Sequence, residues 1–219
     1  MKVMVTGATG FIGSALASTL SASGYSVCCA SRRSPPRLTG EHFIIDSLDA
    51  DTAWSEALNA VDVVVHCAAR VHVMNETAAD PLAEYRRINV DGTLNLARQA
   101  AHAGVGRFIF LSSIKVNGES SQAGSAFTAQ DLPAPADPYS ISKWEAEEAL
   151  RDLSKATGME LVIIRPVLVY GPGVKGNFNS MMGWLNRGIP LPLGAIHNKR
   201  SLVALDNLVH LIITSLAHP

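Results

Sequence analysis

The 219-residue sequence predicts an α/β fold with a doubly wound parallel sheet, and three observations carry that prediction. Short apolar runs of strand length alternate with longer segments of helical period. The short runs are apolar on both faces, which is typical of parallel strands covered by helices on each side. A glycine-rich turn directly follows the first run, at the sheet edge where doubly wound folds bind their ligands.

Each element follows from this alternation. We expect strands over residues 1–6, 26–30, 43–45, 61–66, 107–112 and 161–165. We expect helices over residues 11–23, 49–58, 83–103 and 139–157. After Pro166 the alternation weakens, because glycine and proline residues separate short apolar pieces. This change is typical of a loop-rich lobe that contacts a substrate.

Composition excludes several classes of protein. Hydrophobic residues make up 47% and charged residues 17%, which is unlike a disordered chain. The net charge is −1 without a basic block, so nucleic acid is not an expected partner. No apolar run reaches the roughly 18 residues of a membrane span, so we expect no membrane partner. Cys28, Cys29 and Cys67 are interpreted as buried thiols, and the chain as cytoplasmic without a signal peptide.

Gly7, Gly10 and Gly13 form the turn between the first expected strand and the first helix. Glycine permits unusual dihedral angles and a close approach of phosphate to backbone N–H groups at a helix N-terminus. The spacing is Gly-x-x-Gly-x-x-Gly and differs from the standard Gly-x-Gly-x-x-Gly. An ordinary tight turn is the alternative, but the strand–turn–helix context favours a dinucleotide.

The sequence resembles the extended short-chain dehydrogenases/reductases, the NAD-dependent epimerase/dehydratase family that includes nucleotide-sugar 4-epimerases and 4-ketoreductases. Ordered motifs carry the resemblance over nearly the whole chain: Thr6–Gly13, Asp62–Ala69, Asn89–Asn95, Leu111–Gly118, Tyr139–Lys143 and Arg165–Gly173. The resemblance implies a Rossmann fold, hydride transfer on a nucleotide-linked sugar with UDP as the expected nucleotide, and a role in polysaccharide biosynthesis.

The end of the second strand bears on the choice of dinucleotide. An acidic residue there binds the ribose of NAD, but this sequence has Ser31, Arg32 and Arg33. Because arginine binds a 2′-phosphate well, we favour NADP over NAD. A solvated arginine pair, with NAD as the cofactor, is the alternative. The resemblance adds further cofactor contacts at Phe11, Ile12, Asp46, Ala68, Ala69, Pro166 and Val169.

Tyr139 and Lys143 lie four residues apart on an expected helix, so their side chains share one face. A phenol beside an ammonium can transfer protons, because positive charge favours the phenolate. A surface pair without function is the alternative. The resemblance makes Ser113, Tyr139 and Lys143 the catalytic residues and leaves Ser112 structural. His66 is expected in the core, while Asn89 fits either a proton relay or helix–loop packing.

The two residues that follow Ser113 limit the possible reactions. Sugar dehydratases of the resembling family have an acidic pair where this chain has Ile114 and Lys115, which disfavours dehydration. A 4-epimerase and a 4-ketoreductase remain nearly even. Asn117 replaces a usual tyrosine and, with Lys115, suggests a distinct substrate subgroup such as N-acetylated sugars.

On the substrate side, the resemblance implies that Arg200 and Asn177 contact the diphosphate, and that Ser113 and Lys115 contact the sugar. The alternative for Arg200 and Asn177 is that they are solvated surface residues. We expect residues 1–170 to form the dinucleotide-binding domain and residues 171–219 part of a small, incomplete substrate-binding lobe. Family members continue further, so a truncated chain is one interpretation. Pairing of helices 83–103 and 139–157 predicts a homodimer.

Two other functions remain as alternatives. A non-catalytic dinucleotide sensor on the same fold would not need Ser113, Tyr139 and Lys143 together. A reductase of small non-sugar ketones would share these residues but would not need Arg200. No metal ligand set is evident from the spacing of cysteine and histidine.

Overall fold

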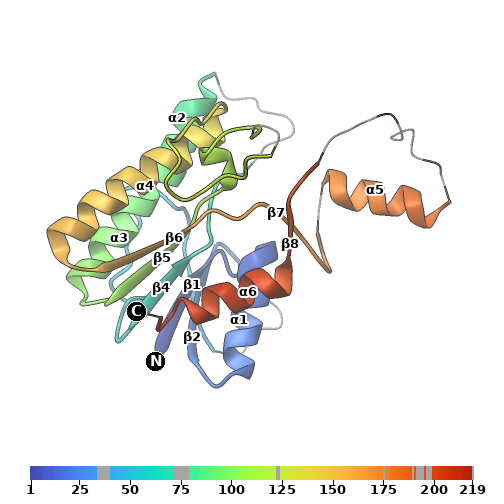
Figure 1. Ribbon diagram of the computed structural model, residues 1–219. Coiled ribbons are helices and arrows are strands. Elements are labelled where there is room, and N and C mark those ends of the chain that lie inside the picture. Colours follow the sequence, from blue (N-terminus) through green and yellow to red (C-terminus); the bar gives the residue numbers. More distant parts are fainter. Residues whose placement is uncertain are drawn as a thin grey trace.

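The computed structural model describes residues 1–33, 40–71, 79–121, 124–174, 176–188, 190, 195 and 199–218. A six-stranded parallel sheet forms its centre (Figure 1). The strands lie in the order β3-β2-β1-β4-β5-β6. Their bounds are β1 (Lys2–Thr6), β2 (Ser26–Ser31), β3 (Glu41–Ile44), β4 (Val63–His66), β5 (Arg107–Leu111) and β6 (Glu160–Ile164). This is the strand order of the Rossmann fold, so the predicted fold class is confirmed.

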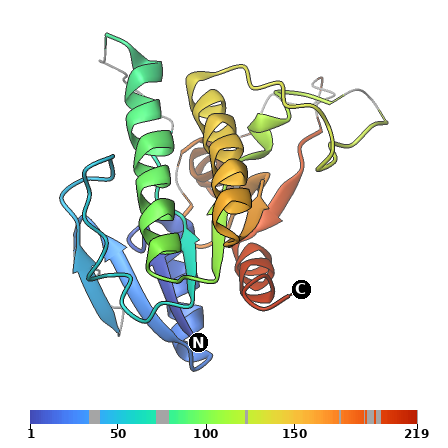
Figure 2. The same ribbon diagram turned by 90° about the vertical axis from the view of Figure 1, so that its left-hand side faces the viewer.

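Helices cover both faces of the sheet (Figure 1). Val3 and Val5 pack on the face covered by α1 (Phe11–Ala22) and α6 (Leu205–Thr214). Met4, between them, packs on the face covered by α3 (Thr93–His102) and α4 (Pro138–Thr157). Figure 2 shows α3 and α4 side by side across that second face. Alternate residues of one strand therefore belong to two separate cores.

The helix predicted over residues 83–103 is interrupted. It consists of α2 (Pro81–Arg86), a π-helical turn η1 (Arg87–Gly92) and α3. Gly92 in this turn packs against the backbone of Leu48, where a Cβ atom would lie 2.8 Å from the Leu48 carbonyl oxygen. The close approach of another loop therefore accompanies the irregular turn.

The prediction of a helix over residues 49–58 is wrong, because this segment consists of turns and irregular backbone. Side chains of α3 form hydrogen bonds with the backbone groups of this segment instead. Asn95 Nδ2 and Gln99 Nε2 donate to the Thr52 carbonyl oxygen at 2.8 and 2.9 Å. Gln99 Oε1 accepts from the Trp54 backbone N–H at 2.8 Å. Long-range bonds thus replace the local bonds that a helix would use.

After β6 the chain leaves the sheet and later returns to it. β7 (Leu168–Tyr170) and β8 (Leu202–Ala204) form a separate parallel pair, with α5 (Asn177–Asn186) between them in sequence. Figure 1 shows α5 away from the sheet. In contrast, α6 buries Leu205, Leu208, Val209 and Ile212 in the core. The domain division at residue 170 stays a prediction, but α6 packs with the first domain.

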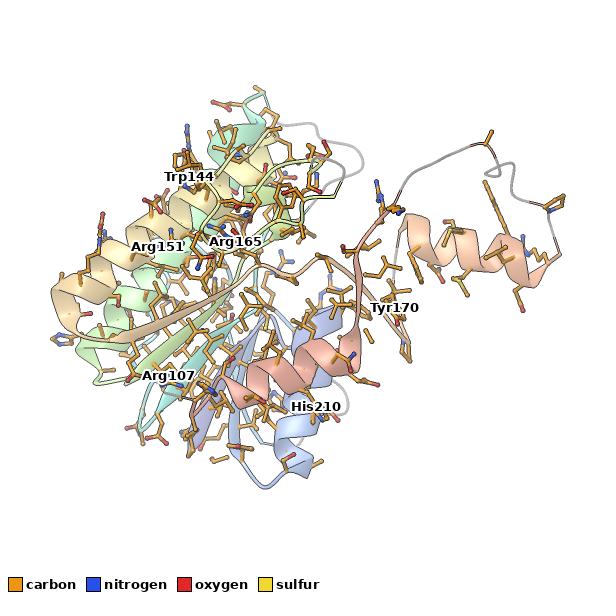
Figure 3. All side chains as sticks on the ribbon, viewed as in Figure 1. Arg107, Trp144, Arg151, Arg165, Tyr170 and His210 are labelled. Carbon is orange, nitrogen blue, oxygen red and sulfur yellow. The ribbon has the colours of Figure 1, made fainter. Side chains whose placement is uncertain are left out.

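The start of β5 also holds the end of α6. Arg107 Nη1 donates to the Ser215 carbonyl oxygen at 2.7 Å, and Figure 3 shows Arg107 beside this helix end. Within the described ranges, no helix is both long and apolar enough to cross a membrane.

Candidate active site

The glycine turn makes room at the N-terminus of α1. Gly7 has φ +68°, and its carbonyl oxygen accepts from the Gly10 N–H at 2.8 Å. A Cβ atom on Gly7 would lie 2.8 Å from the Ala68 nitrogen, and one on Gly13 would lie 2.3 Å from the Gly7 carbonyl oxygen. Gly10 is the N-cap of α1 and offers no side-chain cap. Side-chain-free space beside helix N–H groups fits a pyrophosphate.

The end of β2 is closed by a hydrogen bond within the turn. Ser31 is buried, and its Oγ donates to the Arg33 carbonyl oxygen at 2.6 Å. Arg32 and Arg33 are exposed. Asp46 lies exposed, two residues after β3. The Ser31 hydroxyl is therefore already bonded, while both guanidinium groups face solvent.

A cavity of about 600 Å³ lies at the carboxyl edge of the sheet. It gathers the three predicted catalytic residues, Ser113, Tyr139 and Lys143. Other predicted site residues also line it, namely Ile12, Ala69, Lys115, Pro166, Val169 and Arg200. Gly7, Gly10, Phe11, Gly13 and Ala68 lie at the glycine turn and the end of β4. Asn177 begins α5, but its side chain lies outside the described part of the chain.

Tyr139 is half-buried, and burial raises its pKa to about 12. A hydrogen bond with the Ser113 side chain and the charge of Lys115 oppose this rise, while Asp137 and Tyr85 add to it. The net direction is opposite to the lowering expected from Lys143. Tyr139 with this pKa is a phenol at neutral pH.

Lys143 is buried, with Nζ 4.0 Å from the centroid of the Phe110 ring. Burial lowers its pKa to about 7, although interactions with Cys67 and Glu147 partly counteract this effect. The ammonium therefore gains or loses its proton near neutral pH. Any negative group that enters the cavity beside it would favour the charged form.

A buried ionic network fixes α4 to the ends of β5 and β6. Glu147 accepts from Ser112 Oγ at 2.5 Å, from Arg165 Nη2 at 2.5 Å and from Arg151 Nη2 at 3.0 Å. Figure 3 shows Arg151 and Arg165 beside α4. Ser112 thus has the structural place expected for it. The sequence interpretation missed Glu147, although an acidic residue one turn after Lys143 was a usable signal.

Asn117 belongs to this network and does not contact the cavity. Its Oδ1 accepts from Arg165 Nη1 at 3.0 Å, and its Nδ2 donates to the Thr128 carbonyl oxygen at 2.9 Å. The side chain is 5% exposed. Its amide therefore supports the protein interior, and the substrate subgroup suggested from Asn117 and Lys115 stays a prediction.

His66 and Asn89 occupy structural positions. The His66 ring forms hydrogen bonds with Thr6 Oγ1 at 2.8 Å and Thr93 Oγ1 at 3.0 Å. Burial, with a smaller contribution from the nearby lysine, lowers its pKa to about 3. Asn89 accepts from the Arg70 N–H at 2.8 Å and donates to the Arg70 carbonyl oxygen at 3.0 Å. Its Nδ2 also donates to Ser142 Oγ on α4 at 3.0 Å. These bonds support helix–loop packing, and the proton-relay role stays a prediction.

Lys115 and Arg200 both line the cavity, come from different elements and differ in their partners. Lys115 Nζ contacts Asp137 Oδ2 at 2.5 Å and Glu119 Oε1 at 3.2 Å. Arg200 and its neighbour Lys199 are exposed on the β8 side. The cationic side near β8 thus offers charge to a diphosphate, whereas Lys115 is already paired.

The three cysteines are free, and burial raises each thiol pKa: to about 12 for Cys28, about 11 for Cys29 and about 12 for Cys67. They are therefore neutral thiols at neutral pH. The described residues contain no cluster of three or more His, Cys, Asp or Glu side chains able to hold a metal ion.

The sheet order, glycine turn and cavity define a Rossmann-fold protein of the dinucleotide-binding class. The model of the NAD dependent epimerase/dehydratase family matches residues 3–219, and the chain belongs to that family, as the resemblance predicted. It is 50% identical over 220 residues to UDP-glucose 4-epimerase of Vibrio cholerae. This match covers all of this chain and 67% of the relative. The chain spans 50% and 62% of two further curated relatives.

Solved structures agree with the family assignment. MoeE5 in complex with UDP-glucuronic acid and NAD has a TM-score of 0.83 at 30% identity, covering 100% of this chain and 73% of that one. UDP-glucuronic acid 4-epimerase from Bacillus cereus, in complex with UDP-glucuronic acid and NAD, has a TM-score of 0.83 at 28% identity. That match covers 99% of this chain and 73% of the other.

Proposed function

We propose that the full-length protein interconverts the C4 epimers of a UDP-linked hexose, with a nicotinamide dinucleotide as cofactor. One observation carries the proposal: Ser113, Tyr139 and Lys143 line a single cavity at the sheet edge beside the glycine turn. The 50% identical relative from Vibrio cholerae is a UDP-glucose 4-epimerase, which supports the same reaction here. UDP-glucose is therefore the first substrate to test.

In this proposal Ser113 and Tyr139 act at the reacting oxygen. The Ser113 hydroxyl orients the C4 oxygen. Tyr139, held as the phenolate by positive charge from Lys143 and a bound oxidised nicotinamide, takes the hydroxyl proton during oxidation and returns it during reduction. Lys143 supplies positive charge beside the nicotinamide ribose. A bound nicotinamide would supply the acceptor for the C4 hydride, and the donor that returns this hydride once the keto sugar has turned its other face to the ring. Gly7, Gly10 and Gly13 provide the space for its pyrophosphate.

The resident cofactor is proposed to be NAD. Arg32 and Arg33 favoured NADP from sequence, but the solved relatives named above contain NAD. An epimerase also regenerates its cofactor in every cycle, so it needs no reducing supply of NADPH. Affinities of the full-length protein for NAD⁺ and NADP⁺, measured in parallel, decide the question. Tighter binding of NADP⁺ would restore the sequence-based preference.

Substrate binding is proposed at Arg200 and Asn177 for the diphosphate. Residues 171–219, apart from α6 in the core, are proposed to form part of a substrate lobe. We also propose a homodimer that pairs the face of α3 and α4, which light scattering of the full-length protein tests. A cytoplasmic place in polysaccharide assembly fits sugar-nucleotide chemistry and the neutral free thiols.

The test is turnover of UDP-glucose by the full-length protein with NAD⁺. We expect UDP-galactose to form without net accumulation of NADH, whereas a ketoreductase would consume reduced cofactor stoichiometrically. Tyr139→Phe should lower kcat by roughly 10²- to 10⁴-fold because it removes the proton carrier. Tyr25→Phe is the control, since Tyr25 precedes β2 at the opposite edge of the sheet. Equal turnover by wild type and Tyr139→Phe would overturn the proposal.

A further inference from the structure

Lys115 joins two elements that carry different parts of the site. It lies in the short 3₁₀ turn η2 (Ile114–Val116), whose N-cap is Ser113. The Lys115 N–H donates to Ser113 Oγ at 3.2 Å. Its Nζ reaches Asp137 Oδ2 at 2.5 Å, 22 residues further along the chain. One residue therefore contacts both the Ser113 side chain and the start of α4.

Asp137 is the N-cap of α4, the helix that carries Tyr139. Its Oδ1 accepts from the Ser140 N–H at 2.8 Å, and Ser140 Oγ accepts from the Asp137 N–H at 3.1 Å. This capping box fixes the first turn of α4 through one carboxylate oxygen. The other carboxylate oxygen is the one that binds Lys115. The ion pair thus connects the loop of Ser113 directly to the turn of Tyr139.

We propose that Lys115 is a positioning residue, whose ion pair with Asp137 sets Ser113 and Tyr139 in register for proton transfer. The inference rests on the proposed function of the same cavity. It differs from a substrate-binding role for Lys115, because Asp137 and Glu119 already neutralise the ammonium. Such a pair acts on kcat and not on sugar affinity.

The same pair acts on the charge of Tyr139. The groups that act on Tyr139 are Asp137 at the N-cap of α4, Tyr85 on α2, and Ser113 and Lys115 at η2. Lys143, one turn further along α4, lines the same cavity. Lys115 lowers the pKa of Tyr139, whereas Asp137 raises it. Loss of Lys115 should raise this pKa further, and loss of the Asp137 charge should lower it. Single substitutions of the two partners therefore predict opposite shifts.

The kinetic test uses Lys115→Met and Lys115→Arg in the full-length protein with UDP-glucose and NAD⁺. We expect Lys115→Met to lower kcat by roughly tenfold to a hundredfold with little change in KM. Lys115→Arg should recover most of the loss, because a guanidinium can bind the same carboxylate. Lys155→Met is the matched control, since it breaks an exposed ion pair with Asp152 at the far end of α4. A raised KM with unchanged kcat would overturn the inference.

Two further measurements separate this inference from the proposed function. In a cycle with Asp137→Asn, the double variant should lose no more kcat than the worse single variant, because both remove one contact. Phenolate absorbance of the NAD⁺-bound protein, with Tyr139→Phe as the blank, should show the opposite pKa shifts. If wild type turns over no UDP-sugar, the proposed function fails, yet this titration still decides the role of Lys115. Shifts in the same direction, or none, would overturn it.

Discussion

Helices α4 and α5 both follow glycine- or proline-containing loops, yet they are held in different ways. α4 has a capping box at Asp137, ends at Gly158 with φ +77°, and buries the side chains of Lys143 and Glu147. α5 begins after Gly176 without a side-chain cap, and none of its described side chains is buried. Tertiary contacts therefore determine α4, whereas α5 depends on its own weak helical preference.

The difference explains which site residues are already organised. Tyr139 and Lys143 take their positions from a helix fixed at both ends and along one face. The apolar side chains of α5 remain outside the core, with Met182, Trp184 and Leu185 about half exposed. We infer that the hydride-transfer side of the cavity is preformed, while the substrate side is defined less strongly by the fold.

The largest expected loss of stability comes from breaking the ionic network of α4. Glu147→Gln removes the charge opposite Arg165, whose side chain is 12% exposed, and should cost about 3–5 kcal/mol of unfolding free energy. Glu148→Gln is the control, because Glu148 is an exposed neighbour that also pairs with Arg151. It should cost no more than about 1 kcal/mol. Urea unfolding measures both, and equal losses would contradict the special place of Glu147.

The free energy of unfolding should fall in acid because of His66. Its folded pKa is about 3, below the unfolded value of about 6.5, so the unfolded state binds the proton first as pH falls. The stability is fully present above about pH 6.5 and should be about 2 kcal/mol lower at pH 5. His66→Gln should remove this slope. An unchanged slope in pH-dependent urea unfolding would contradict the assignment.

A smaller effect is expected at the end of α4. Gly158→Ala places a side chain at φ +77°, where open space surrounds the new Cβ, so only backbone strain counts. We expect a loss of about 1 kcal/mol by thermal unfolding. No loss would show that the end of α4 is as loosely determined as α5.

The smallest effect has the opposite sign and concerns α5. Gly183 lies inside this helix, and a Cβ there meets nothing within 4 Å. Gly183→Ala should stabilise α5 locally by about 0.5–1 kcal/mol, which slower amide hydrogen exchange would report. Global stability should change less than the local exchange. Faster exchange would mean that α5 is held by contacts at this glycine.

The sequence predicted the fold well where its signals were local or periodic. Strands apolar on both faces and the turn at Gly7 indicated the doubly wound sheet, and the spacing of Tyr139 and Lys143 indicated one helical face. The turns near Thr52 were missed because their bonding partners lie on α3, more than forty residues away. The buried hydrogen bond of Asn117 was missed for the same reason, since its partner Arg165 becomes a neighbour only in the folded sheet.

The paired strands β7 and β8 have a consequence for the segment that lies between them in sequence. They run parallel in register, with Val169 opposite Val203, so the intervening segment departs from and rejoins the body at adjacent points. The length and chemistry of such a segment can therefore vary while the six-stranded sheet and α6 stay intact. Under the proposed function, changes in this segment would alter the sugar side of the site while Ser113, Tyr139 and Lys143 keep their places.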